Sequence, residues 1–120
     1  MAKVLVVDDD PDARALLRTL LSGLGHTVLL APNGQAALGV YHQTKPDLII
    51  TDLAMPALNG VSLIEQFRAL QPDIRIIAIS GKGKEELQRA RNAGAAAMLR
   101  KPIDRVDLVT ELTRVLAMRL

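Results

Sequence analysis

Five short apolar runs alternate with longer amphipathic segments along the whole sequence. The runs are rich in β-branched and aliphatic residues and are nearly continuous, which is typical of strands buried on both faces of a parallel sheet. They occupy residues 4–7, 27–30, 48–50, 74–79 and 97–99. Strands that alternate with helices predict parallel pairing, with helices covering both faces of the sheet.

The segments between these runs carry helix-terminal signals. The first helix is expected to begin at an Asp10 cap followed by Pro11, and the fifth at an Asp104 cap. The others are expected to begin near Asn33, to follow Gly60, and to span residues 84–92. The residues expected to face the core in the first and third helices are Leu16, Leu17, Leu20, Leu21 and Leu24, and Val61, Ile64, Phe67 and Leu70.

We therefore predict an α/β fold with a five-stranded parallel sheet in the flavodoxin-like order 2-1-3-4-5, a (βα)5 three-layer sandwich. The 120 residues suit one domain, 1–120, and the sequence contains neither a linker nor an internal repeat. Aromatic residues make up 2% of the chain, so the core must be aliphatic. There is no cysteine for a disulfide or a thiolate metal site.

No apolar run reaches the length of a membrane span, and no signal peptide is apparent, so we expect a soluble cytoplasmic protein without membrane contact. Residues 82–120 carry a net charge of +4, whereas residues 1–81 carry −2. A basic region of this kind could meet nucleic acid or an acidic partner. Because no aromatic residues interleave with these charges, we favour a solvated surface and expect no direct binding of nucleic acid.

Polar residues follow four of the five expected strands. Asp8 and Asp9 follow the first strand, Asp52 the third, Ser80 the fourth and Lys101 the fifth. In a doubly wound sheet, ligands bind outside the carboxyl ends of the strands, so these side chains are expected to converge. Each residue taken singly has an ordinary explanation as a turn, cap or surface residue, and it is their joint placement that indicates a site.

Three carboxylates at one sheet edge are unfavourable by themselves, because like charges about 4 Å apart repel by roughly 4 kcal/mol. A bound hard divalent cation would offset this repulsion. Mg2+ prefers oxygen ligands and is commonly held by carboxylates together with a phosphate. Lys101 adds a positive charge and Ser80 a hydroxyl donor, which are groups that stabilise a transferring phosphoryl group. Aspartate is itself a known phosphoryl-accepting nucleophile.

Four sequence motifs together resemble the receiver domain of two-component response regulators, either as a stand-alone protein or as part of a larger regulator. They are Val-Val-Asp8-Asp9-Asp10-Pro11, Asp47-Leu-Ile-Ile-Thr-Asp52-Leu-Ala-Met55-Pro56-Ala-Leu-Asn59-Gly60, Ile-Ile-Ala-Ile-Ser80 and Leu-Arg-Lys101-Pro102. Their order and spacing agree with that family over essentially the whole chain. The resemblance implies that Asp52 is the phosphoacceptor. It also implies that Mg2+ is bound by Asp8, Asp9, Asp52 and the backbone carbonyl of Ala54.

The resemblance further implies that Lys101 pairs with a phosphoryl oxygen, that Ser80 is the switch hydroxyl, and that a cis peptide precedes Pro102. The phosphoryl donor would be a sensor histidine kinase or a histidine phosphotransfer protein. The output would be a downstream effector protein that reads the face made by the fourth helix, the fifth strand and the fifth helix, and phosphorylation could also drive homodimerisation. Such a domain is no enzyme beyond its own phosphorylation and dephosphorylation. Met98 stands where the family often has an aromatic switch residue.

Three alternatives remain at this point. A receiver-like interaction module would have the same residues without being phosphorylated. A haloacid-dehalogenase-type phosphatase would use Asp8 as nucleophile and Asp10 as acid, but it requires Thr or Val where this chain has Asp12. A flavodoxin-type cofactor binder would need a phosphate-binding loop rich in Gly, Ser or Thr after the first strand, which is missing.

Overall fold

The computed structural model describes residues 2–54 and 60–118, and it has the predicted sheet. Five parallel strands lie in the order β2-β1-β3-β4-β5. Met55, Pro56 and Asn59, which belong to the second motif, lie outside the described residues. The strands are β1 (Lys3–Val7), β2 (Thr27–Ala31), β3 (Leu48–Asp52), β4 (Ile76–Ser80) and β5 (Ala97–Arg100).

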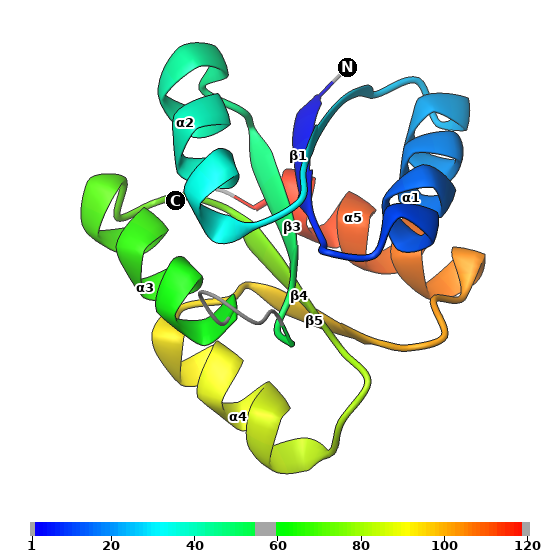
Figure 1. Ribbon diagram of the computed structural model, residues 1–120. Coiled ribbons are helices and arrows are strands. Elements are labelled where there is room, and N and C mark those ends of the chain that lie inside the picture. The colour runs from blue at the N-terminus through cyan, green and yellow to red at the C-terminus, as the bar shows by residue number, and fades with distance from the viewer. Residues whose placement is uncertain (1, 55–59, 119–120) are drawn as a thin grey trace.

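Helices cover both faces of this sheet (Figure 1). In α1 and α5 the capping aspartates Asp10 and Asp104 accept hydrogen bonds from backbone N–H groups of the first turn, as predicted. Asn33 caps α2 in the same way. The helices are α1 (Pro11–Gly23), α2 (Gly34–Thr44), α3 (Gly60–Leu70), α4 (Lys84–Ala93) and α5 (Arg105–Leu116).

Strand side chains alternate between two apolar clusters, one on each face of the sheet. Leu5 and Val7 contribute to the cluster under α2, α3 and α4, in which Phe67 is the largest fully buried side chain. Val4 and Val6 contribute to the cluster under α1 and α5. The fully buried strands β3 and β4 therefore place their last residues, Asp52 and Ser80, at the edge of the core.

Two leucines predicted to face the core do not. Leu16 and Leu70 are 49% and 48% exposed. In α1, Leu17 and Leu21 are buried and cover the sheet, so the inward stripe is narrower than predicted. In α3 the inward face includes Leu63, which the predicted stripe omitted. Helical spacing alone does not fix which edge of an apolar stripe meets the sheet.

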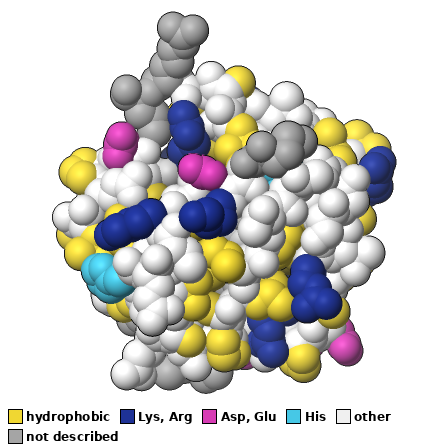
Figure 2. Space-filling view, turned by 90° about the horizontal axis from the view of Figure 1, so that it is seen from above, with side chains coloured by type: hydrophobic (Ala, Val, Ile, Leu, Met, Phe, Trp, Pro, Cys, Tyr) yellow, Lys and Arg dark blue, Asp and Glu magenta, His cyan; other side chains and the backbone are white. Residues whose placement is uncertain are grey.

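The carboxyl ends of the strands and the loops after them lie at the lower side of Figure 1. Figure 2 looks at the opposite side, where Lys and Arg side chains are spread among many apolar side chains and a few acidic ones. Within the described residues, no helix is both long enough and apolar enough to cross a membrane.

Candidate functional site

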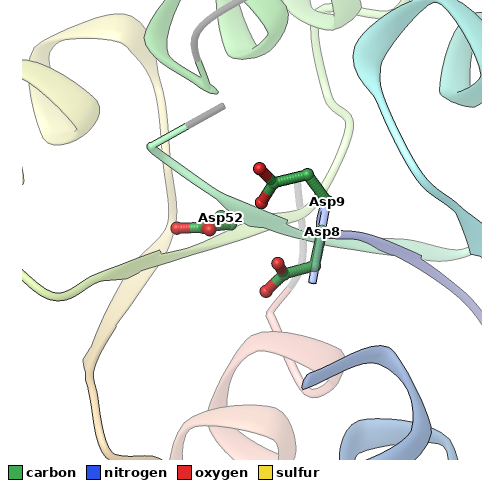
Figure 3. A group of neighbouring side chains, drawn as sticks. All are labelled: Asp8, Asp9 and Asp52. Atoms are coloured by element: carbon green, nitrogen blue, oxygen red, sulfur yellow. The ribbon is translucent and has the colours of Figure 1, made fainter. Parts of the chain in front are cut away.

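The three predicted acidic residues meet at the carboxyl ends of β1 and β3. Asp8 and Asp9 directly follow β1, and Asp52 is the last residue of the adjacent strand β3. Their carboxylates lie on one side of the strand ends around a common space (Figure 3). One oxygen from each can be chosen so that all lie within 4.8 Å of one another. Asp8 and Asp52 are buried, whereas Asp9 is exposed.

Backbone donors fix the orientation of both buried carboxylates. Asp8 Oδ1 accepts the Asp10 N–H at 2.9 Å, and Asp52 Oδ1 accepts the Ala54 N–H at 3.2 Å. The carbonyl of Asp8 accepts a 2.7 Å hydrogen bond from Arg14 of α1, which ties the end of β1 to that helix. Arg14 was not predicted to have this role. Ala54 thus lies beside the acidic group, and the ligand role of its carbonyl stays a prediction.

Lys101 reaches the acidic group from the end of β5. Its Nζ donates a 3.1 Å hydrogen bond to Asp52 Oδ2 and lies 3.9 Å from Asp8 Oδ2. Partial burial lowers the pKa of Lys101, but the hydrogen bond to Asp52 and the charges of Asp52 and Asp8 outweigh this effect. The pKa is raised above its ordinary value of 10.5, so the side chain is a cation at neutral pH. The peptide bond between Lys101 and Pro102 is cis, as the resemblance implied.

Asp8 has the least favourable environment for a charged carboxylate in the acidic group. Burial raises its pKa above the ordinary value of 3.8; the Asp10 N–H opposes this shift, and the negative charge of Asp52 adds to it. Asp8 Oδ2 is buried and accepts no hydrogen bond. An acidic oxygen left without a donor beside two further carboxylates fits a divalent cation, and an all-oxygen ligand set with no His or Cys suits Mg2+.

Ser80 lies at the end of β4, on the strand next to β3, as predicted. Among the described residues, its hydroxyl forms no hydrogen bond with the carboxylate of Asp8, Asp9 or Asp52. It donates to the Glu86 carboxylate and accepts the Lys82 N–H at 3.0 Å. Glu86 was missed from the sequence, although its position four residues before the buried Ala90 places both on one face of α4.

Met98 lies in β5, partly buried against the cluster under α2, α3 and α4. Together with Leu87 of α4 and Asp107, Thr110 and Glu111 of α5 it lines a shallow depression on the surface. The face predicted to carry the output therefore exists as one continuous surface of α4, β5 and α5.

Comparison with known proteins agrees with this geometry. The profile of the response regulator receiver domain matches residues 4–113. The chain belongs to the response regulator receiver domain family. This receiver domain is 35% identical to Protein PilH of Pseudomonas aeruginosa over 120 residues, which cover 98% of the chain and 99% of PilH. It is 32% identical to the chemotaxis protein CheY of Thermotoga maritima, over 94% of the chain and 96% of CheY.

A solved structure agrees as well. The receiver domain protein from Clostridium thermocellum superimposes with a TM-score of 0.91 at 28% identity, over 97% of this chain and 94% of that one. The fold and the family predicted from the sequence are confirmed, and the chain is a phosphoacceptor-type signalling domain. Neither the phosphatase nor the non-phosphorylated module is favoured by these relatives.

Proposed function

We propose that this receiver domain accepts a phosphoryl group on Asp52 from a phosphohistidine donor. The observation that carries the proposal is the 3.1 Å hydrogen bond from Lys101 to Asp52, made beside carboxylates whose oxygens lie within 4.8 Å of one another. An Asp52 oxygen forms the new bond to phosphorus as the bond from phosphorus to the histidine nitrogen breaks. The imidazole leaves with the electron pair and is neutral when its other ring nitrogen is protonated.

Asp8, Asp9 and Asp52, with the backbone carbonyl of Ala54, would hold Mg2+. When bound, the ion balances the charge of the carboxylates and of the phosphoryl oxygens. The residues of the chain do the remaining work. Lys101 pairs with a phosphoryl oxygen. The N–H groups of Asp10 and Ala54 hold the two buried carboxylates in place. The domain turns over no separate substrate, so its chemistry is limited to its own phosphorylation and dephosphorylation.

A protein donor has an apolar surface to pack against beside the acidic group. Leu16 of α1, Pro102 and Ile103 line a groove that also contains Asp8 and Lys101. The 49% exposure of Leu16, which is large for an apolar helix residue, fits contact with a partner. A sensor kinase or histidine phosphotransfer protein that covers this groove would bring its phosphohistidine to Asp52.

The output is proposed to pass through the face of α4, β5 and α5 to a downstream effector in the cytoplasm or to a second copy of the chain. Ser80 is the switch hydroxyl, and Met98 lies in that face in place of an aromatic switch residue. Methionine is flexible enough to change its packing when the neighbouring loop moves.

The test is phosphorylation by acetyl phosphate with and without Mg2+, read as intact mass. We expect the wild type to gain one phosphoryl group only with Mg2+, and Asp52→Asn to gain none. Asp73→Asn is the matched control, since it removes an exposed carboxylate outside the acidic cluster. Labelling that persists in Asp52→Asn and disappears in Asp8→Asn would assign the nucleophile to β1 instead. If neither acetyl phosphate nor a phosphohistidine protein labels the chain, the result would favour the receiver-like interaction module that is not phosphorylated.

A further inference from the structure

Glu86 is a buried acidic side chain that the proposed phosphorylation chemistry does not use. It is 8% exposed, although it lies in the first turn of α4 directly after the exposed Glu85. Its carboxylate accepts a hydrogen bond from the Ser80 hydroxyl. Among the described residues, no Lys or Arg forms an ion pair with it. A buried carboxylate is costly unless it is hydrogen-bonded or paired, so Glu86 depends on this contact with Ser80.

The Ser80 hydroxyl has a single proton to donate. In this structure it donates that proton to Glu86, while Ser80 Oγ accepts the Lys82 N–H. The same hydroxyl therefore cannot donate to a phosphoryl oxygen on Asp52 until the hydrogen bond to Glu86 has broken. Glu86 and the phosphorylated Asp52 compete for one donor.

The start of α4 is less firmly held than the starts of the other helices whose caps are described. Asp10, Asn33 and Asp104 cap α1, α2 and α5 through their side chains. The cap residue of α4 is Gly83, which has no side chain to form such a hydrogen bond. The first turn of α4 can therefore shift at lower cost than those of α1, α2 and α5.

We propose that Glu86 is a latch that holds the Ser80 hydroxyl away from Asp52 and couples phosphorylation to movement of α4. This inference rests on the proposed function. When Ser80 turns to a phosphoryl group, the Glu86 carboxylate loses its donor in a buried position, and the first turn of α4 moves to expose it to water. Glu86 is thus a positioning residue that acts through Ser80. It favours the state without phosphate and slows entry into the phosphorylated one.

The first experiment compares initial rates of phosphorylation by acetyl phosphate and Mg2+, read as intact mass. We expect Glu86→Ala to react at least about tenfold faster than the wild type, because a hydrogen bond to a charged group is lost from the unreactive state. Glu86→Gln can still accept from Ser80 but is uncharged, so its rate should lie between the two. Glu85→Ala is the matched control and should react at the wild-type rate.

A double-substitution cycle tests whether Glu86 acts through Ser80. In a Ser80→Ala background, Glu86→Ala should change the rate less than twofold. Hydrogen exchange of the amides of residues 82–90 gives a second readout, without phosphate. Glu86→Ala should exchange faster there than the wild type, whereas Glu85→Ala should not. If Glu86→Ala folds poorly, Glu86→Gln replaces it in both experiments. Its phosphorylation rate and its hydrogen exchange in residues 82–90 should then also be faster than those of the wild type.

The latch is overturned if Glu86→Ala and Glu86→Gln react at the wild-type rate, if the gain is as large in the Ser80→Ala background, or if Glu85→Ala gives the same gain. These results would leave the proposed function standing, since the wild type would still be phosphorylated on Asp52. A wild type that accepts no phosphoryl group from acetyl phosphate or from a phosphohistidine protein overturns the proposed function and the latch together.

Discussion

The Lys101 ammonium donates a 3.1 Å hydrogen bond to Asp52 Oδ2 across the ends of β5 and β3. The two residues are far apart in the sequence, and the parallel sheet brings them together because all its strands end at the same edge. The same Nζ lies 3.9 Å from Asp8 Oδ2. One cation therefore offsets part of the charge of two buried carboxylates, and it is in place before any phosphoryl group arrives.

Replacement of Lys101 should move two measured quantities in opposite directions. In Lys101→Ala, phosphorylation by acetyl phosphate should slow by roughly a hundredfold, because a charged donor to the phosphoryl oxygen is lost. The affinity for Mg2+ should rise, because the acidic group loses its counter-charge. Initial rates by mass and Mg2+ titration check these effects. Lys82→Ala, which removes an exposed lysine after β4, should change neither; equal effects in both variants would contradict the role given to Lys101.

Asp8→Asn should stabilise the metal-free protein by about 1 kcal/mol, because it removes a buried charge beside Asp52. The pKa of Asp8 is raised, so between 3.8 and that raised value the folded chain binds more protons than the unfolded chain. The free energy of unfolding of the wild type must then fall as pH rises through this window. The advantage of Asp8→Asn should therefore grow with pH.

Chemical unfolding in a chelator from acidic to neutral pH measures this difference, with Asp73→Asn as the control. Added Mg2+ should stabilise the wild type, since a bound ligand favours the folded state, and should stabilise Asp8→Asn much less. A variant that is less stable than the wild type without metal at neutral pH would contradict the inference that Asp8 is destabilising.

The sequence predicted the sheet order and the members of the acidic group, because both follow from rules that depend on local patterns. Buried parallel strands are continuous apolar runs, and residues such as Asp8, Asp52 and Lys101 follow them directly. Helix starts at Asp10, Asn33 and Asp104 were predictable because the capping side chain bonds within its own turn.

The contact between Ser80 and Glu86 could not be predicted in the same way. Glu85 and Glu86 are identical neighbours in the sequence. Helical spacing puts Glu86 on the same face as Ala90, but the packing of α4 on the sheet decides that this face buries a glutamate beside Ser80. The exposure of Leu16 had a similar origin, since Leu16 and Leu17 are adjacent and only one faces the sheet. Packing of one element on another decides such choices, and a single helical pattern does not contain that information.

Met98 should report phosphorylation, although it has no aromatic ring. Its side chain packs beside α4, so a shift of the first turn of α4 should change the environment of its methyl group. With four methionines in the chain, a spectrum of methyl-labelled methionine is simple to assign by substitution. We expect the Met98 signal to move when acetyl phosphate and Mg2+ are added. The Met118 signal, after α5, serves as the control. An unchanged Met98 signal in a fully phosphorylated sample would contradict its place in the output path.

Gly60→Ala should damage both the fold and the site, because the residue lies against the backbone that carries Asp52. A Cβ at this position would come within 2.4 Å of the Asp52 carbonyl oxygen and 2.6 Å of Leu53 Cα. Neither backbone atom can move without shifting the end of β3, so we expect a loss of roughly 2–3 kcal/mol in the free energy of unfolding. Phosphorylation should slow as well, since small displacements of a reacting group are costly.

Gly39→Ala is the control: a Cβ there meets no atom within 4 Å, and alanine in the middle of α2 should stabilise the protein by roughly 0.5–1 kcal/mol. Unfolding curves and acetyl phosphate rates for the two variants check these outcomes. A Gly60→Ala protein with wild-type stability and rate would show that the close contact of Gly60 with the Asp52 backbone does not hold Asp52 in place.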